Sequence, residues 1–140
     1  MVKPLFPLSA ESRCPCGTGL NFGLCCQKYH LGTPAPTALT LMRSRFSAFV
    51  TGDEEYLLRS WDPQTRPASL NLAADTDIKF YRLDIIDTDR GGALDDTGMV
   101  EFEAFYKGTV TGSQRERSVF RKIKHDGKSH WVYTAPTESY

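Results

Sequence analysis

Long apolar runs are missing from this 140-residue chain. None approaches the roughly 18 to 20 apolar residues that a membrane-spanning helix requires, so we expect no insertion into a membrane. The opening stretch, MVKPLFPLSAESR, also lacks the apolar segment of about 7 to 15 residues that marks a secretory signal. We therefore expect a cytoplasmic protein, most simply a bacterial one, whose thiols stay reduced.

An excess of charge of either sign is absent too, because 17 basic residues balance 17 acidic ones. The strong basic field of a nucleic-acid-binding domain is therefore missing, and we expect no nucleic acid partner. Residues 1–50 carry five basic residues and one acidic residue. This modest local excess is either an ordinary solvated surface or a patch that meets an acidic partner. The sequence also contains no glycine-rich nucleotide fingerprint and no phosphate loop.

Cysteine is scarce, and its few copies are clustered. The four thiols of the chain lie in the segment CPCGTGLNFGLCC, at Cys14, Cys16, Cys25 and Cys26. They allow either disulfide bonds or one metal site. A bond between Cys25 and Cys26 would be strained, because adjacent Cα atoms lie about 3.8 Å apart and ordinary disulfides need about 4.4 to 6.8 Å. The two remaining pairings are geometrically feasible but need an oxidising compartment, of which the sequence gives no sign.

The spacing of the two cysteine pairs favours zinc. Zn²⁺ takes four sulfur or nitrogen ligands in a tetrahedron, and two pairs at the ends of a short turn can supply them. Gly17 and Gly19 suit such a turn, since glycine adopts positive φ at little cost. Four filled ligand positions leave no place for water, so we expect a structural rather than a catalytic zinc ion. Arg13 and Lys28 lie near enough in sequence to offset the negative charge of the four thiolates. In an alternative arrangement, His30 replaces one cysteine as a ligand.

After the cysteine segment, apolar residues first recur at helical spacing, and further along the chain the sequence pattern becomes typical of strands. Apolar residues at helical spacing predict a helix over residues 37–52, and early acidic residues predict a second, short helix over 53–61. The apolar stripe of the first helix consists of Leu39, Met42, Phe46 and Phe49. Residues 64–76 resemble an irregular connection, and four runs rich in β-branched and aromatic residues predict strands at 78–87, 97–108, 116–124 and 129–134. Helices followed by antiparallel strands indicate an α+β fold with helices packed on a curved antiparallel sheet.

Five polar or aromatic side chains of this predicted domain are the candidates for the lining of a functional pocket: Arg43, Trp61, Asp62, Glu116 and Arg117. Glu116 is the best candidate for a general base, since burial in apolar surroundings raises the pKa of a carboxyl group. The favoured alternative is an ion pair between Arg43 and Glu116 that fixes the helix against the sheet. We therefore assign no catalytic residue and prefer a binding protein to an enzyme.

The segment CPCGTG…F..CC resembles the SEC-C motif, the small zinc knuckle found at the C-terminus of the bacterial SecA translocase and in many other proteins. Thr18 stands where the motif usually has serine, and Phe22 stands where it has an aromatic residue. The resemblance implies zinc binding by the four cysteines and contact with protein partners.

The stretch APTALTLMRSRFSAFVTGDEEYLLRSWDP, followed by QRERSVF and HWVY, is similar to the uncharacterised bacterial YchJ-like family. This similarity implies a SEC-C knuckle within residues 1–31, with its motif at 14–26, and a cone-like α+β domain over residues 32–140. The second domain would be similar to nuclear transport factor two. Related sequences often have histidine where this chain has Asp62 and Arg115, so two acid–base positions are absent here.

No activity comes with the resemblance. We expect a zinc-binding protein that acts as a protein-interaction or adaptor module. The alternative is a small-molecule binder or an enzyme that uses the interior of the cone. Domains of this kind often dimerise through the sheet, which makes a homodimer a candidate assembly.

Overall fold

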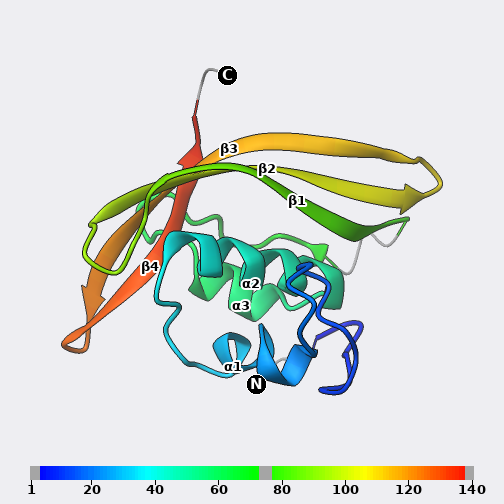
Figure 1. Cartoon of the computed structure of the whole chain (residues 1–140), viewed down its shortest axis with the longest axis horizontal. Coiled ribbons are helices and arrows are strands. Elements are labelled where there is room, and N and C mark those ends of the chain that lie inside the picture. The colour runs from blue at the N-terminus through cyan, green and yellow to red at the C-terminus, as the bar shows by residue number, and fades with distance from the viewer. Residues whose placement is uncertain (1–3, 73–76, 138–140) are drawn as a thin grey trace.

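The computed structural model describes residues 4–72 and 77–137 of the chain. Its main feature is a four-stranded antiparallel sheet whose strands neighbour one another in chain order. The strands are β1 (Ile78–Arg90), β2 (Thr97–Gly108), β3 (Gly112–His125) and β4 (Lys128–Pro136). Figure 1 shows β1, β2 and β3 lying side by side over the helices, while β4 turns away across one end. Register shifts within the β1–β2 and β3–β4 pairs are consistent with this curvature, because an extra residue in one strand bends it and increases its twist.

Helix α2 (Ala38–Thr51) covers the concave face of the sheet, and helix α3 (Glu54–Arg59) packs against α2. Helix α2 begins after Thr37, whose side chain accepts a hydrogen bond from the amide of Thr40, and ends at Gly52, whose φ of 69° places it in the left-handed region. Helix α3 begins after Asp53, whose side chain accepts a hydrogen bond from a backbone amide of the first turn. The α+β prediction, with helices packed on a curved antiparallel sheet, is confirmed.

The main core lies between α2 and the inner face of the sheet. Met42 and Phe46 of the predicted stripe are buried there, Leu39 is partly buried, and Phe49 at the end of the stripe is 38% exposed. The buried members of this core are Ala38, Leu41, Met42, Phe46, Leu83, Val100, Phe102, Ala104, Phe120, Trp131 and Tyr133.

Three strands are longer than the sequence pattern predicts, and one of them is β4, which spans Lys128–Pro136 and not only 129–134. β1 continues beyond residue 87 to Arg90, and β3 begins at Gly112 rather than at residue 116. In both places the added residues pair with β2. Backbone pairing with a neighbouring strand therefore extends these strands past their own apolar residues. Of the predicted connection over 64–76, residues 73–76 lie outside the described residues.

The cysteine segment folds against the helices. It contains a short 3₁₀ turn, η1 (Phe22–Leu24), and one turn of helix, α1 (Gln27–His30). In Figure 1, α2 and α3 lie between the strands and most of this N-terminal segment. Within the described ranges, no helix is both long and apolar enough to cross a membrane.

Candidate metal centre and cavity

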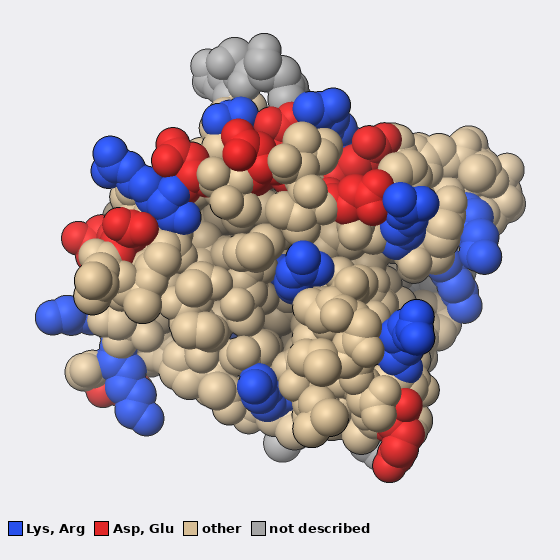
Figure 2. Space-filling view, in the orientation of Figure 1, with Lys and Arg blue, Asp and Glu red and all other residues tan. Residues whose placement is uncertain are grey.

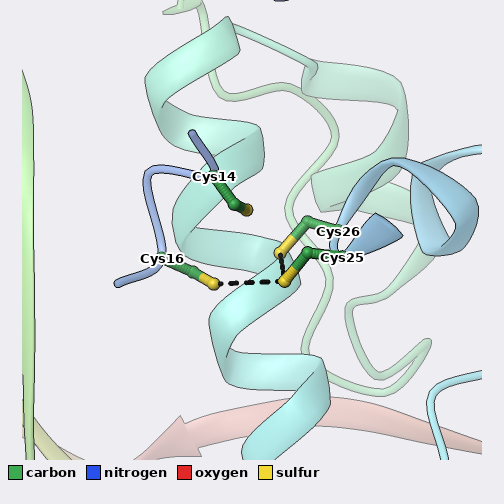
Figure 3. Close-up of side chains that lie close together, drawn as sticks. All are labelled: Cys14, Cys16, Cys25 and Cys26. Carbon is green, nitrogen blue, oxygen red and sulfur yellow. Dashed lines mark hydrogen bonds between the residues drawn. The ribbon is translucent and has the colours of Figure 1, made fainter. Parts of the chain in front are cut away.

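The four cysteines converge on one point from two pieces of chain. Cys14 follows the isolated bridge between Arg13 and Asn21, and Cys16 lies in the turn after it. Cys25 ends η1 and Cys26 precedes α1. Their four sulfur atoms all lie within 4.8 Å of one another. Figure 3 shows the side chains pointing inward beside a helix, with Cys25 Sγ at 3.5 Å from Cys16 Sγ and 3.9 Å from Cys26 Sγ.

These distances fit a tetrahedral metal site. Four sulfurs at about 2.3 Å from a central Zn²⁺ would lie about 3.8 Å from one another, whereas a disulfide needs about 2.05 Å. None of the four cysteines is bonded to another. Cys25 is 9% exposed and the other three are 2% exposed or less. The cluster could therefore hold a metal ion shielded from water, with four soft ligands and no open position.

Two hydroxyl groups lie beside the sulfurs. Thr18 Oγ1 is 3.2 Å from Cys25 Sγ, and Ser47 Oγ of α2 is 3.5 Å from Cys14 Sγ. Hydrogen bonds from Cys16 and its neighbours hold the pKa of Cys14 well below its usual range, whereas burial raises the pKa of Cys25 to about 11. The hydroxyl of Ser47 can donate a hydrogen bond to the thiolate of Cys14.

Arg43 and His30 join the cysteine segment to α2. Arg43 Nη1 donates a 2.7 Å hydrogen bond to the carbonyl oxygen of Cys16. His30 Nε2 lies 2.8 Å from the carbonyl oxygen of Ser44, and since a carbonyl only accepts, Nε2 carries the hydrogen. The ring of His30 is thus engaged with the helix, and the clustered ligand atoms are the four sulfurs. Arg43 and Ser47 are one helical turn apart, so both contacts come from the same side of α2.

A cavity of about 360 Å³ lies between α2 and the concave face of the sheet. Of the predicted pocket residues, Trp61 and Glu116 line it, and Arg45 lines it in place of Arg43. Its apolar wall consists mainly of Met42, Phe46, Phe49, Ile78, Phe80, Phe102 and Ala104. A hollow with this size and this mostly apolar lining can hold a small organic molecule.

The polar end of the cavity is a hydrogen-bonded network. Glu116 accepts hydrogen bonds from Ser118 Oγ and from Tyr133 Oη, and it does not pair with Arg43. Arg45 is 3% exposed, donates to Leu57 O and Ser60 Oγ, and lies 4.8 Å from the centre of the Tyr133 ring. Burial lowers the pKa of Arg45 to about 10, so the guanidinium stays charged at neutral pH.

The remaining predicted pocket residues lie outside the cavity. Arg117 donates to Glu101 on the convex face of the sheet, beside Arg115, which donates to the same carboxylate. Asp62 is fully buried against Arg121 at the edge of β4. Figure 2 shows acidic side chains, with basic ones among them, gathered along the upper edge of the molecule where Figure 1 places the strands.

A buried cluster of four cysteines, joined to helices on a curved antiparallel sheet, defines the class of proteins that combine a SEC-C-type knuckle with a domain like nuclear transport factor two. Solved structures agree with this assignment. A SEC-C motif containing protein from Psychrobacter arcticus matches with a TM-score of 0.77 at 28% identity, over 94% of this chain and 85% of that chain. RPA3114, a SEC-C motif containing protein from Rhodopseudomonas palustris, matches with a TM-score of 0.75 at 28% identity, over 91% of this chain and 99% of that chain.

Sequence comparison identifies the family. The model of the YchJ middle NTF2-like domain matches residues 37–136. The UPF0225 protein CE1570 of Corynebacterium efficiens is 54% identical over 129 residues, which are 91% of this chain and 95% of that protein. The UPF0225 protein SCO1677 of Streptomyces coelicolor is 50% identical over 121 residues, 86% of this chain and 90% of that protein. The chain belongs to the UPF0225 family of proteins with a YchJ-like NTF2-like domain.

Proposed function

We propose that this chain is a cytoplasmic zinc-binding protein and that its knuckle is a protein-interaction or adaptor module. In this proposal residues 1–31 carry a structural zinc ion, and residues 32–140 form the cone-like scaffold that supports the knuckle. The observation that carries the proposal is the convergence of four buried sulfur atoms within 4.8 Å. Such a site has every ligand position filled by protein, so the ion stabilises structure and binds no substrate.

The residues around the four sulfur atoms can offset the negative charge of a zinc ion bound by four thiolates. Four thiolates around Zn²⁺ carry two excess negative charges, which nearby donors and cations must offset. Thr18 and Ser47 supply hydroxyl groups to the sulfurs, and Arg43 brings a guanidinium to the carbonyl oxygen of Cys16. Two of these three residues come from α2 and the knuckle is bound to it, so the scaffold helps to define the site.

The outer surface of the knuckle supports an interaction role. Leu20, Leu24 and Leu31 are 49%, 68% and 80% exposed, whereas Phe22 is buried in the cluster formed with the four cysteines. Exposed apolar side chains are typical of a contact with another protein where they form one patch.

Two single substitutions test the proposal. The native chain is expected to carry one zinc ion by elemental analysis, and Cys25→Ser is expected to lose it, because three thiolates hold zinc less tightly than four. Leu24→Asp is the matched control, since it changes an exposed neighbour and leaves all four ligands in place. Leu24→Asp should keep its zinc. A partner protein that in-cell cross-linking joins to the native knuckle should no longer be cross-linked to this variant. Equal zinc in the native chain and Cys25→Ser, or a cross-linked partner unaffected by Leu24→Asp, would contradict the proposal.

The cavity supports a second candidate function, a small-molecule binder or an enzyme that uses the cone interior. The observation in its favour is the apolar hollow of about 360 Å³ that ends at Glu116. A carboxylate at the end of an apolar cavity can accept a hydrogen bond or a proton from a ligand.

Filling the cavity tests this second candidate. Ala104→Phe adds a ring at a lining position, whereas Ala93→Phe adds the same ring at an exposed loop position. A small molecule seen by native mass spectrometry of the purified protein should remain bound to Ala93→Phe and be absent from folded Ala104→Phe. A bound molecule retained by both variants would place it outside the cone, and the absence of any bound molecule would count against this candidate.

A further inference from the structure

A second hollow, of about 590 Å³, lies on another side of the molecule and belongs to neither of the sites above. It runs between the linker after α1, the end of α3 and the β3–β4 hairpin. We call it the hairpin groove. Its cationic and imidazole side chains are Arg59, Arg66, His125 and His130, and no aspartate or glutamate is among its described lining residues. The chain as a whole has no net charge, so this one-signed lining is a local feature.

We propose that the hairpin groove binds a small organic anion, in which a phosphate or carboxylate group is attached to an apolar or aromatic body. The anionic group would lie against Arg66 and His130, and the body against the apolar wall of the groove. This site is independent of the zinc knuckle and of the cone cavity.

The two arginines are already held in place for such a ligand. Arg66 donates from Nε and Nη2 to the carbonyl oxygen of Trp61, and Arg59 donates from Nη2 to the carbonyl oxygen of His30. A guanidinium has five N–H donors, so each side chain keeps further donors after these contacts. Because the side chains are anchored, an anion would bind with less loss of side-chain freedom.

Two of the four cationic and imidazole side chains of the groove lie within 4.0 Å of a carboxylate. Glu55 Oε1 is 3.7 Å from Arg59 Nη1, and Asp126 Oδ2 is 3.3 Å from His125 Nε2. The Glu55 and Asp126 side chains are 42% and 86% exposed, so solvent screens both pairs. Among the described residues no carboxylate lies within 4.0 Å of the Arg66 guanidinium, which leaves Arg66 as the cation most available to a ligand.

The apolar wall of the groove fits the body of the proposed ligand. It includes Leu41, Pro63, Ile123, Trp131 and Val132. Trp131 is 4% exposed, and its indole N–H has no acceptor among the described residues. This N–H is closed to solvent, so the groove offers a ligand part of the indole ring and not an exposed hydrogen-bond donor.

Phenyl phosphate and phenylacetate are suitable probes, because they share an aromatic body and differ in the anionic group. The chain has two tryptophans, and Trp61 lines the cone cavity while Trp131 lines the hairpin groove. In ¹H–¹⁵N spectra of the full-length protein, either probe or both should shift the indole signal of Trp131 in a saturable manner and leave that of Trp61 in place. Which probe binds more tightly identifies the preferred anionic group.

Charge-neutral variants complete the test. Arg66→Gln should weaken binding about tenfold, as expected for the loss of a charge-assisted hydrogen bond. Lys107→Gln is the control, because it removes the same charge from an exposed position on β2 outside the groove and should change the affinity less than twofold. The proposal is overturned if neither probe binds, if Trp61 shifts in place of Trp131, if the uncharged analogue benzyl alcohol binds equally well, or if Arg66→Gln and Lys107→Gln bind alike.

Discussion

Replacing Cys16 by serine is expected to lower the free energy of unfolding by about 4 kcal/mol, which is the range reached when a protein loses a structural metal. Cys16 is fully buried, and its sulfur is one of the four that converge. If the cluster holds zinc as proposed, loss of the ion would leave the remaining thiolates repelling one another in a buried site, so they must take up protons or move apart. Urea denaturation of the native chain and the variant, both prepared with zinc, measures the difference.

Chelation separates loss of the metal from loss of packing. A strong chelator should bring the native chain close to the stability of Cys16→Ser and should leave the variant unchanged. Ser113→Ala, a change at an exposed strand position, serves as the control and should respond to the chelator as the native chain does. A native chain that keeps its full stability in the chelator would contradict the prediction.

The effect should extend into α2, because the knuckle is bound to this helix at three points. Cys14 lies beside Ser47, Arg43 donates to the carbonyl oxygen of Cys16, and His30 donates to Ser44. The opposite side of α2 lines the cone cavity through Met42 and other residues. Faster amide exchange in the second half of α2 after chelation would therefore accompany the loss of stability.

The cysteine cluster could be predicted from the sequence because its signal is local. Two pairs of thiols separated by a turn of eight residues can meet without help from the rest of the fold. The contacts made by Ser47 and Arg43 were not predictable in the same way. They depend on which side of α2 the knuckle occupies, and the sequence of the knuckle does not state this.

The two arginines of α2 show where helical periodicity stops being informative. With 100° per residue, Arg43 and Arg45 both lie about 80° from the middle of the predicted apolar stripe, on opposite sides of it. Sequence reasoning therefore had no basis for choosing between them. In the fold, Arg43 faces the knuckle and Arg45 faces the cavity, where it is covered by α3 and by the Tyr133 ring.

Side chains alternate between the two faces of a strand, and this rule could have excluded some of the predicted pocket residues. Glu116 and Arg117 are adjacent in β3, so their side chains point to opposite faces and only one of them can enter the cavity. Trp61 and Asp62 behave in the same manner, because Trp61 forms a bridge to β4 and the chain there is extended. Trp61 consequently points inward, while Asp62 points to the side of the sheet that carries Arg121.

Asp62→Ala is expected to lower the free energy of unfolding by about 3 kcal/mol at neutral pH, since removing one partner of a buried ion pair leaves the other unpaired. The Asp62 side chain is completely buried, whereas that of Arg121 is 35% exposed, which keeps the expected loss at the lower end of the usual range. Asp62 also accepts hydrogen bonds from the amide of Gln64 and from Thr134 Oγ1. Asp84→Ala is the matched control, because it breaks an exposed pair with Arg82 and should cost less than about 0.5 kcal/mol.

The loss in Asp62→Ala should depend on pH in a defined direction. The hydrogen bonds from Arg121 lower the pKa of Asp62 from 3.8 to about 2 in the folded chain. A carboxylate whose pKa is lowered by folding stabilises the protein above its unfolded value, and this contribution disappears as the pH falls through the folded value. The difference in unfolding free energy between the native chain and Asp62→Ala should therefore stay constant from pH 7 to about 4 and shrink between about pH 4 and 2. A difference that is small at pH 7, or one that grows on acidification, would show that the ionised carboxylate of Asp62 does not join the end of α3 to the sheet.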